Sequence, residues 1–479
     1  MPSMRFRRVT MSAVSARATV LLGRAIGAAA LCAAGAFAQS EKLPPIHPLS
    51  PVEHASKELL GAVSQVRALP GGRLLVNDNA GRKLVLYDAA LAQFSVVADT
   101  TSATANAYSS RAAGLIAYKG DSSFFVDPSS LSMLVLDGAG KVTRVISVPR
   151  PNEAQALIGG PNGTPGFDGK GRLVYRAPPQ LAMRAPAANG AFSMPVFPDS
   201  QAIVRIELAS RVVDTVGFVK VPKVLMSMTQ DANGRMSISS TTNPMPVTDD
   251  WAVLSDGSVA LVRGIDYHVD WVRPGGERQS TGKTPFAWRH LDDSAKVAFL
   301  DSTKTALEKL REQANARMAA GGVNGPILMG GAGDAVTAGG GGMVEFRVRA
   351  GGDEGARKAA PPAGGDGRGG APGAQTFTLP PIQLVAASEL PDYAPPFTQG
   401  AARGDMDGNL WVRTSNVVNG GSVYDVINSQ GALVDRILVP AGRVIAGFGT
   451  GGVVYMGVRE AAGVRLEQAR RNLMANASK

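Results

Sequence analysis

Residues 66–88 read VRALPGGRLLVNDNAGRKLVLYD, and this stretch decides the fold. It holds an apolar run, a Pro-Gly-Gly turn at 70–72, a second apolar run that ends in Asn77 and Asp78, and a third apolar run at 84–88. Pro-Gly and Gly-Gly pairs supply the positive-φ positions that tight hairpins need. The stretch therefore predicts three antiparallel β-strands joined by short turns.

The same pattern recurs five more times along the chain. The further copies span residues 114–127, 165–176, 251–263, 400–413 and 444–456. Their turns lie near positions 122, 171, 257, 408 and 451, and most neighbouring turns are therefore separated by the length of one blade of a β-propeller, about 40–50 residues. We predict an all-β fold, a six-bladed β-propeller with one enlarged blade between positions 171 and 257.

An insertion separates the fourth copy from the fifth. Asp292 or Asp293 is positioned to cap a helix, and its apolar residues recur at helical spacing: Val297, Leu300, Leu307, Leu310, Ala314 and Met318. Residues 321–375 are rich in Gly, Ala and Pro, and we expect them to be disordered because they bury too little apolar surface. We therefore assign 59–290 to blades 1–4, 291–320 to an inserted helix, 376–470 to blades 5–6 and 471–479 to a tail.

The N-terminal residues 1–38 resemble a secretory signal peptide. Five arginines precede a short apolar run that ends in the small-residue sequence Ala36-Phe37-Ala38. We therefore expect an exported protein, periplasmic or extracellular, with no transmembrane segment after cleavage and with residues 39–58 as a flexible lead. The only cysteine, Cys32, lies inside the signal, so the mature chain offers no thiol.

The charge of the chain argues against a nucleic-acid partner. The formal net charge is +10, but the five arginines of the signal leave +5 for the mature protein. No dense basic stripe with interleaved aromatic residues is present, which is the footprint that nucleic-acid binding requires.

The repeats resemble those of a known superfamily. Residues 72–88, with a Val-x-Asp strand end followed by a Val-x-x-Tyr-Asp-like strand, resemble the NHL-type repeat, and DGNLWV at 407–412 is similar to bacterial TolB-like and gluconolactonase-like propellers. The resemblance covers residues 59–470 without the insertion. It implies the six-bladed fold and carries no catalytic residues to this chain.

In such a propeller, the ends of the second strands and the starts of the first strands meet at one mouth of the central channel. The candidate funnel residues at these positions are Asn77, Asp78, Arg111, Asp127, Arg176, Asp250, Arg263 and Arg413, with Asp249 and Arg443 beside them. Arginine is in excess, and its guanidinium fork matches carboxylate, phosphate or sulfate. The alternative is that Arg and Asp of neighbouring blades only satisfy one another.

Two classes of function remain open at this stage. The first is a binding or scaffold protein whose funnel takes a small anionic ligand or the acidic segment of a protein partner. The second is an enzyme: a metal-assisted, lactonase-like hydrolase using Asn77, Asp78, Asp127 and Asp250, or a quinoprotein-like dehydrogenase with His268 as base. The sequence itself predicts no cofactor and no metal-ligand motif, and we expect His268 and Asp270 to be structural.

Overall fold

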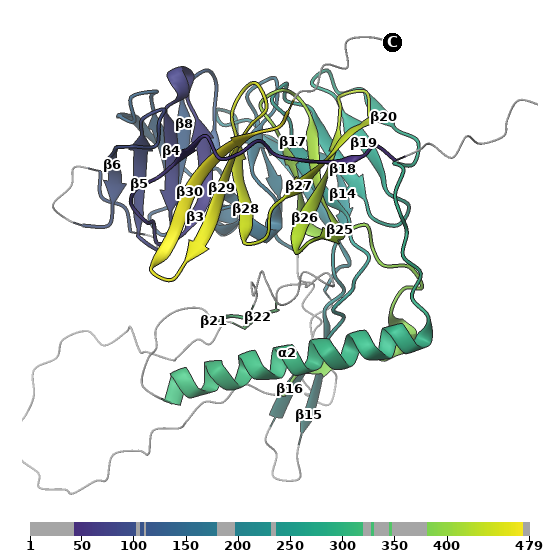
Figure 1. The fold of residues 1–479 in the computed structure, drawn as a ribbon. Coiled ribbons are helices and arrows are strands. Elements are labelled where there is room, and N and C mark those ends of the chain that lie inside the picture. The colour runs from purple at the N-terminus through teal and green to yellow at the C-terminus, as the bar shows by residue number, and fades with distance from the viewer. Residues whose placement is uncertain are drawn as a thin grey trace, which may run out of the picture. The chain divides into compact units, whose positions relative to one another are not determined.

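The computed structural model describes residues 43–101, 106–109, 112–179, 197–230, 236–319, 327–329, 344–346 and 381–472. The predicted signal peptide, Cys32, Arg111 and most of the predicted disordered segment lie outside these residues. The described residues from Pro44 onwards belong to one compact unit. Within it, six antiparallel sheets follow one another along the chain and pack side by side (Figure 1).

The first three sheets correspond to the first three sequence repeats. Each runs from an inner to an outer strand in chain order. Blade 1 consists of β3 (Val63–Ala68), β4 (Leu74–Asp78), β5 (Lys83–Tyr87) and β6 (Phe94–Asp99). Blade 2 consists of β7 (Gly114–Ala117), β8 (Ser123–Asp127), β9 (Ser132–Leu136) and β10 (Val142–Ser147). Blade 3 consists of β11 (Gly166–Phe167), β12 (Leu173–Arg176), β13 (Ser200–Ile206) and β14 (Val213–Lys220).

The last three sheets complete the propeller. Blade 4 consists of β17 (Asp250–Val253), β18 (Val259–Arg263), β19 (His268–Val272) and β20 (Arg278–Ser280). Blade 5 consists of β24 (Phe397–Gly404), β25 (Leu410–Val418), β26 (Gly421–Ile427) and β27 (Leu433–Val439). Blade 6 consists of β28 (Arg443–Phe448), β29 (Val453–Glu460) and β30 (Gly463–Arg470). Because β28 lies against β3, the ring closes and the predicted six-bladed fold is confirmed.

The N-terminal lead completes the ring, and here our expectation of a flexible segment at 39–58 differs from the structure. β1 (Ile46–Pro48) pairs in parallel with β27, and β2 (His54–Ala55) pairs antiparallel with β30. Blade 6 thus takes its fourth strand from the beginning of the chain. The backbone groups at these two sheet edges are thereby satisfied, which removes edges that would otherwise be open to pairing.

The strands are buried on both faces because each blade packs between two neighbours. Every residue of β4 is buried, with Leu74 and Val76 in an apolar cluster shared with blade 6 and Leu75 in one shared with blade 2. This explains why the repeats read as continuous apolar runs instead of alternating ones.

The turn of blade 4 requires glycine. Gly257 has a φ of 82°, and a Cβ there would lie 2.0 Å from the Gly169 nitrogen.

Two excursions from the blades build a separate group of elements. β15 (Leu225–Gln230) and β16 (Met236–Thr242) follow blade 3, and β16 pairs in parallel with β23 (Gln383–Leu384). Between blades 4 and 5 lie α2 (Asp293–Ala319), the short strands β21 (Ile327–Met329) and β22 (Val344–Phe346), and the 3-10 turn η4 (Ala387–Glu389). The predicted helical insertion between blades 4 and 5 is therefore confirmed, and α2 lies beside β15 and β16 (Figure 1).

The buried face of α2 differs in part from the predicted one. Asp292 caps the helix, because its carboxylate accepts a hydrogen bond from the Ala295 nitrogen at 2.8 Å. Leu300 and Ala314 face inward as predicted, whereas Val297 is exposed and Lys296 is buried instead. Lys296 is buried because its ammonium reaches Asp392 at 2.6 Å, so its aliphatic stem covers the core while its charge is paired.

Candidate functional site

Two of the predicted funnel residues, Asp78 and Asn77, are engaged by backbone groups of the protein. The Asp78 carboxylate accepts hydrogen bonds from the backbone nitrogens of Gly61, Ala62 and Gly81 at 2.7 to 2.9 Å. Asn77 donates to the carbonyl oxygen of Ala113 at 2.8 Å and thus ties blade 1 to the start of blade 2. These contacts occupy the Asp78 carboxylate and the Asn77 amide nitrogen, whereas Asn77 Oδ1 is buried without a hydrogen-bond partner among the described residues.

Asp127 and Arg263 are also engaged by the protein itself. Asp127 accepts hydrogen bonds from the Ser109 nitrogen and hydroxyl, each at 2.9 Å. Arg263 reaches Asp249 at 2.7 Å and Asp270 at 2.8 Å, and it donates to the carbonyl oxygen of Phe218 at 2.8 Å. Although burial opposes its charge, these carboxylates raise the pKa of Arg263. Pairing between Arg and Asp thus accounts for this part of the mouth.

His268 belongs to the same network. Its Nδ1 lies 2.6 Å from Asp266 and its Nε2 lies 3.4 Å from Asp270. The strand neighbour Asp270 is the more distant of the two, in keeping with the splay of alternate residues on one face of a strand. His268 is thus held between two carboxylates, one of which also binds Arg263.

Arg176 and Asp250 are the charged funnel residues that keep a buried polar atom without a partner among the described residues. Arg176 Nη2 donates to the side chain of Asn162, but its Nη1 has no hydrogen-bond partner there. Asp250 Oδ2 accepts from the Ala402 nitrogen at 2.7 Å, but its Oδ1 has none. The side chains are only 5% and 1% exposed. Burial lowers the pKa of Arg176 to about 10 and raises that of Asp250 to about 6.

A loop at residues 159–163, which contains the 3-10 turn η3 (Gly160–Asn162), lies over the inner strands at this mouth; we call it the channel loop. The carbonyl oxygen of Asn162 accepts a hydrogen bond from Trp251 of blade 4 at 3.0 Å. A Cβ at Gly159 would lie 2.7 Å from Gln65 of blade 1, and one at Gly400 of blade 5 would lie 3.6 Å from Pro161. Because the loop touches inner strands from three other blades, it lies across the channel entrance.

Arg403, which our reading of the sequence missed, and Arg413 carry charge on the inner hairpin of blade 5. Both are half-buried, and neither forms an ion pair or hydrogen bond with any described residue. Burial lowers the pKa of Arg403, and the neighbouring charge of Arg413 lowers it further. Asp250 acts on the pKa of both Arg176 and Arg403, so these three groups share one region of the channel.

A further arginine, Arg67, is the last residue but one of its inner strand, as Arg403 is of β24. Arg67 of β3 donates to the carbonyl oxygen of Gly120 in blade 2 at 2.7 Å, and its Nη1 lies 3.9 Å from the sulfur of Met406 in blade 5. Its Nε is buried without a partner among the described residues, and burial lowers its pKa. Arg67 thus reaches across the channel.

Neither a metal centre nor a membrane span emerges from the described part of the chain. No three residues among its His, Asp and Glu side chains come together in a way that could hold a metal ion. None of its helices combines the length and the apolar character needed to cross a bilayer.

Comparisons with known proteins assign the chain to no family and give it no function. No protein-family model matches the chain, and no curated protein matches it. Among solved structures, the chain is similar to a gluconolactonase from Xanthomonas campestris, with 8% identity, coverage of 90% of this chain and 99% of that chain, and a TM-score of 0.33. The chain is a six-bladed propeller, as its own strand pairing shows.

Two other solved structures are similar to the same extent. One is the PQQ-bound aldose sugar dehydrogenase from Streptomyces coelicolor, with 10% identity, coverage of 89% of this chain and 99% of that chain, and a TM-score of 0.36. The other is virginiamycin B lyase from Staphylococcus aureus, with 10% identity, coverage of 87% and 97%, and a TM-score of 0.32.

Proposed function

We propose that the protein is an exported binding protein whose central channel holds a small anion, a carboxylate or a phosphate. The observation that carries this proposal is the pair Arg403 and Arg413, two half-buried guanidinium groups that repel each other and have no ion-pair partner among the described residues. A buried cation without a partner is costly, and a bound anion would offset that cost.

The balance of charge along the channel supports the same proposal. Arg67, Arg176 and Arg403 all have lowered pKa values, because burial outweighs the few carboxylates near them. Asp121 is the carboxylate that acts on Arg67, and Asp250 is the one that acts on Arg176 and Arg403. Gln399, near the channel loop, adds a buried amide nitrogen without a partner in the described part of the chain. Donors in excess of acceptors favour an anionic ligand.

Binding of succinate, phosphate and sulfate, measured by calorimetry and by thermal shift at low ionic strength, tests the proposal. We expect at least one of these anions to bind, and Arg403→Gln and Arg413→Gln to weaken its affinity by about tenfold each, since a hydrogen bond to a charged group is worth about 1.5–3 kcal/mol. The matched control is Arg144→Gln, which removes an exposed arginine from the outer strand β10 of blade 2 and should leave the affinity unchanged.

Three results would contradict the proposal. The first is that none of the three anions binds. The second is that Arg403→Gln and Arg413→Gln both bind the anion as the wild type does. The third is stabilisation by calcium without any response to anions, which would favour the metal-assisted hydrolase instead. Because the three anions differ in shape and charge, their relative affinities also indicate the chemical class of the natural ligand.

A further inference from the structure

The unpartnered polar atoms of Arg176 and Asp250 indicate which hydrogen-bonding groups the ligand carries besides its negative charge. Within the described residues, Arg176 Nη1 is a donor without an acceptor, and Asp250 Oδ1 is an acceptor without a donor. Both side chains are more than nine-tenths buried. An unmade hydrogen bond of a buried charged group is costly, so two such atoms in one place call for a partner.

The two side chains do not satisfy each other, although each charge acts on the pKa of the other. Arg176 instead turns its Nη2 to Asn162 of the channel loop, and Asp250 turns its Oδ2 to the backbone nitrogen of Ala402. The free atoms thus belong to groups from different blades that lie near each other without forming an ion pair. A group placed between them must accept on one side and donate on the other.

On this basis, and resting on the proposed function, we infer that the ligand carries an ammonium group as well as its acid groups, as an acidic α-amino acid does. A carboxylate of the ligand accepts from Arg176 and from the arginines of blade 5. The ammonium donates to Asp250 Oδ1. Asp250 is then the residue that sets specificity among anions, and the arginines supply the general attraction.

An ammonium group fits Asp250 better than a hydroxyl group or a water molecule does. Burial raises the pKa of Asp250 to about 6, although the charge of Arg176 attracts the carboxylate and the Ala402 nitrogen donates to its Oδ2. The ionised carboxylate is therefore under-compensated at neutral pH. A neutral donor would complete its hydrogen bonds, but only a cation would also balance its charge.

Aspartate, malate and succinate form a matched set of probes, because they share two carboxylates and differ only in bearing an ammonium, a hydroxyl or a hydrogen at one carbon. Calorimetry with the full-length mature protein at pH 7.5 compares them. We expect aspartate to bind about tenfold more tightly than succinate, which corresponds to about 1.4 kcal/mol, with malate between them. This ranking is a stringent test, because succinate and malate carry one more net negative charge than aspartate. Attraction to the arginines alone would therefore favour succinate and malate.

Asp250→Asn provides the second measurement. We expect aspartate to lose its advantage over succinate in this variant, while succinate binds as well as or better than before because a nearby negative charge is gone. Arg403→Gln should instead weaken all three probes in parallel. If Asp250→Asn fails to fold, the ranking of the three probes on the wild-type protein still decides the matter.

The outcomes separate this inference from the function on which it rests. If succinate binds and aspartate binds no more tightly, the ammonium group is refuted and the anion site stands. If aspartate is favoured equally by the wild type and by Asp250→Asn, the role of Asp250 is refuted. If none of the three probes binds, the proposed function itself fails.

Discussion

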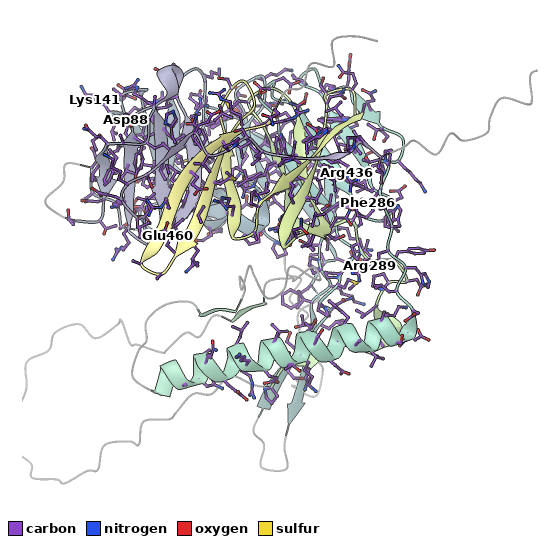
Figure 2. All side chains as sticks on the ribbon, in the orientation of Figure 1. Asp88, Lys141, Phe286, Arg289, Arg436 and Glu460 are labelled. Carbon is purple, nitrogen blue, oxygen red and sulfur yellow. The ribbon has the colours of Figure 1, made fainter. Side chains whose placement is uncertain are left out.

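Asp425 shows how burial of one carboxylate makes stability depend on pH. It lies on β26, is 1% exposed, and accepts a hydrogen bond from the Tyr267 hydroxyl of blade 4 at 2.9 Å. Arg436 of β27 (Figure 2) lies 3.4 Å from its other oxygen. Burial nevertheless dominates and raises the pKa of Asp425 to about 6. The folded state therefore favours the protonated acid more than the unfolded state does.

This sign fixes the pH window of a stability test. The contribution of Asp425 to stability is fully present below about pH 4, and it is lost as the pH rises through about 6. Asp425→Asn mimics the protonated acid, so we expect its free energy of unfolding, relative to the wild type, to increase by up to about 3 kcal/mol between pH 4 and pH 7.5. Urea unfolding at both pH values measures the change.

The control for this test is Asp301→Asn, which changes an exposed carboxylate on α2. We expect this variant to follow the wild type at both pH values. If the difference between Asp425→Asn and the wild type is the same at pH 4 and pH 7.5, the ionisation of Asp425 does not differ between the folded and unfolded states, and the expectation is wrong.

At the same scale, the sequence predicted the positions of site residues better than their roles. Arg176 and Asp250 emerged because strand ends and strand starts converge at one mouth of a propeller. The same rule predicted Asp78 and Asn77. Their partners, however, are backbone groups of nearby segments, and no pattern of side chains in the sequence indicates such partners. Arg403 was missed because it lies inside β24, where only the three-dimensional ring tells that the strand lines a channel. A lone arginine between Ala402 and Gly404 was the available signal.

Among the elements, the two N-terminal strands are the shortest ones that connect distant parts of the propeller. β2 has two residues, yet it is anchored by neighbours on both sides: Ser56 Oγ accepts from the Leu466 nitrogen at 3.1 Å, and Glu53 receives Arg470 Nε at 2.9 Å. β1 is held by His47, whose Nδ1 lies 3.0 Å from Asp435. These contacts join β1 and β2 to the last two blades, across 388 positions for His47 and 410 for Ser56.

Removing these strands should open the ring. We expect a chain that starts at residue 57 to have a lower melting temperature by about 2 °C or more, because the edges of β27 and β30 lose their hydrogen-bonded partners and at least about 1–2 kcal/mol, and the shift per kcal/mol is small in a domain of this length. Limited proteolysis should then cut first within blade 6. A chain that starts at residue 43 keeps both strands and serves as the control. Equal melting temperatures for the two chains would contradict the closing role.

Element by element, the sequence is informative where the signal is local. The hairpins of the six repeats follow from apolar runs and turn residues a few positions apart, and the strands formed as predicted. β1 and β2 are too short to stand out, and their partners lie at the far end of the chain, so local patterns do not reveal them. The pairing of β16 with β23 has the same cause, because an insertion separates the two strands.

The described part of the chain contains two kinds of core. Five apolar clusters run around the ring, each shared between neighbouring blades. A sixth cluster joins α2 to the segments around β15 and β23, with Met245, Leu291, Val385, Leu390 and Ala394 at its centre and no residue from a blade. Cooperativity follows shared packing, so these two cores should respond separately to a local perturbation.

Hydrogen exchange can separate the two cores. Leu300→Asn places a polar group against the sixth cluster and should cost about 2–3 kcal/mol there. We expect peptides from 293–319, 225–230 and 236–242 to lose protection, while peptides from the blades exchange as in the wild type and the main melting transition stays in place. Leu261→Ala, in the cluster shared by blades 2 to 4, should have the opposite effect. The temperature of the main melting transition should fall, and peptides from the blades should lose protection. Loss of protection in the blades of Leu300→Asn would mean that the two cores unfold as one.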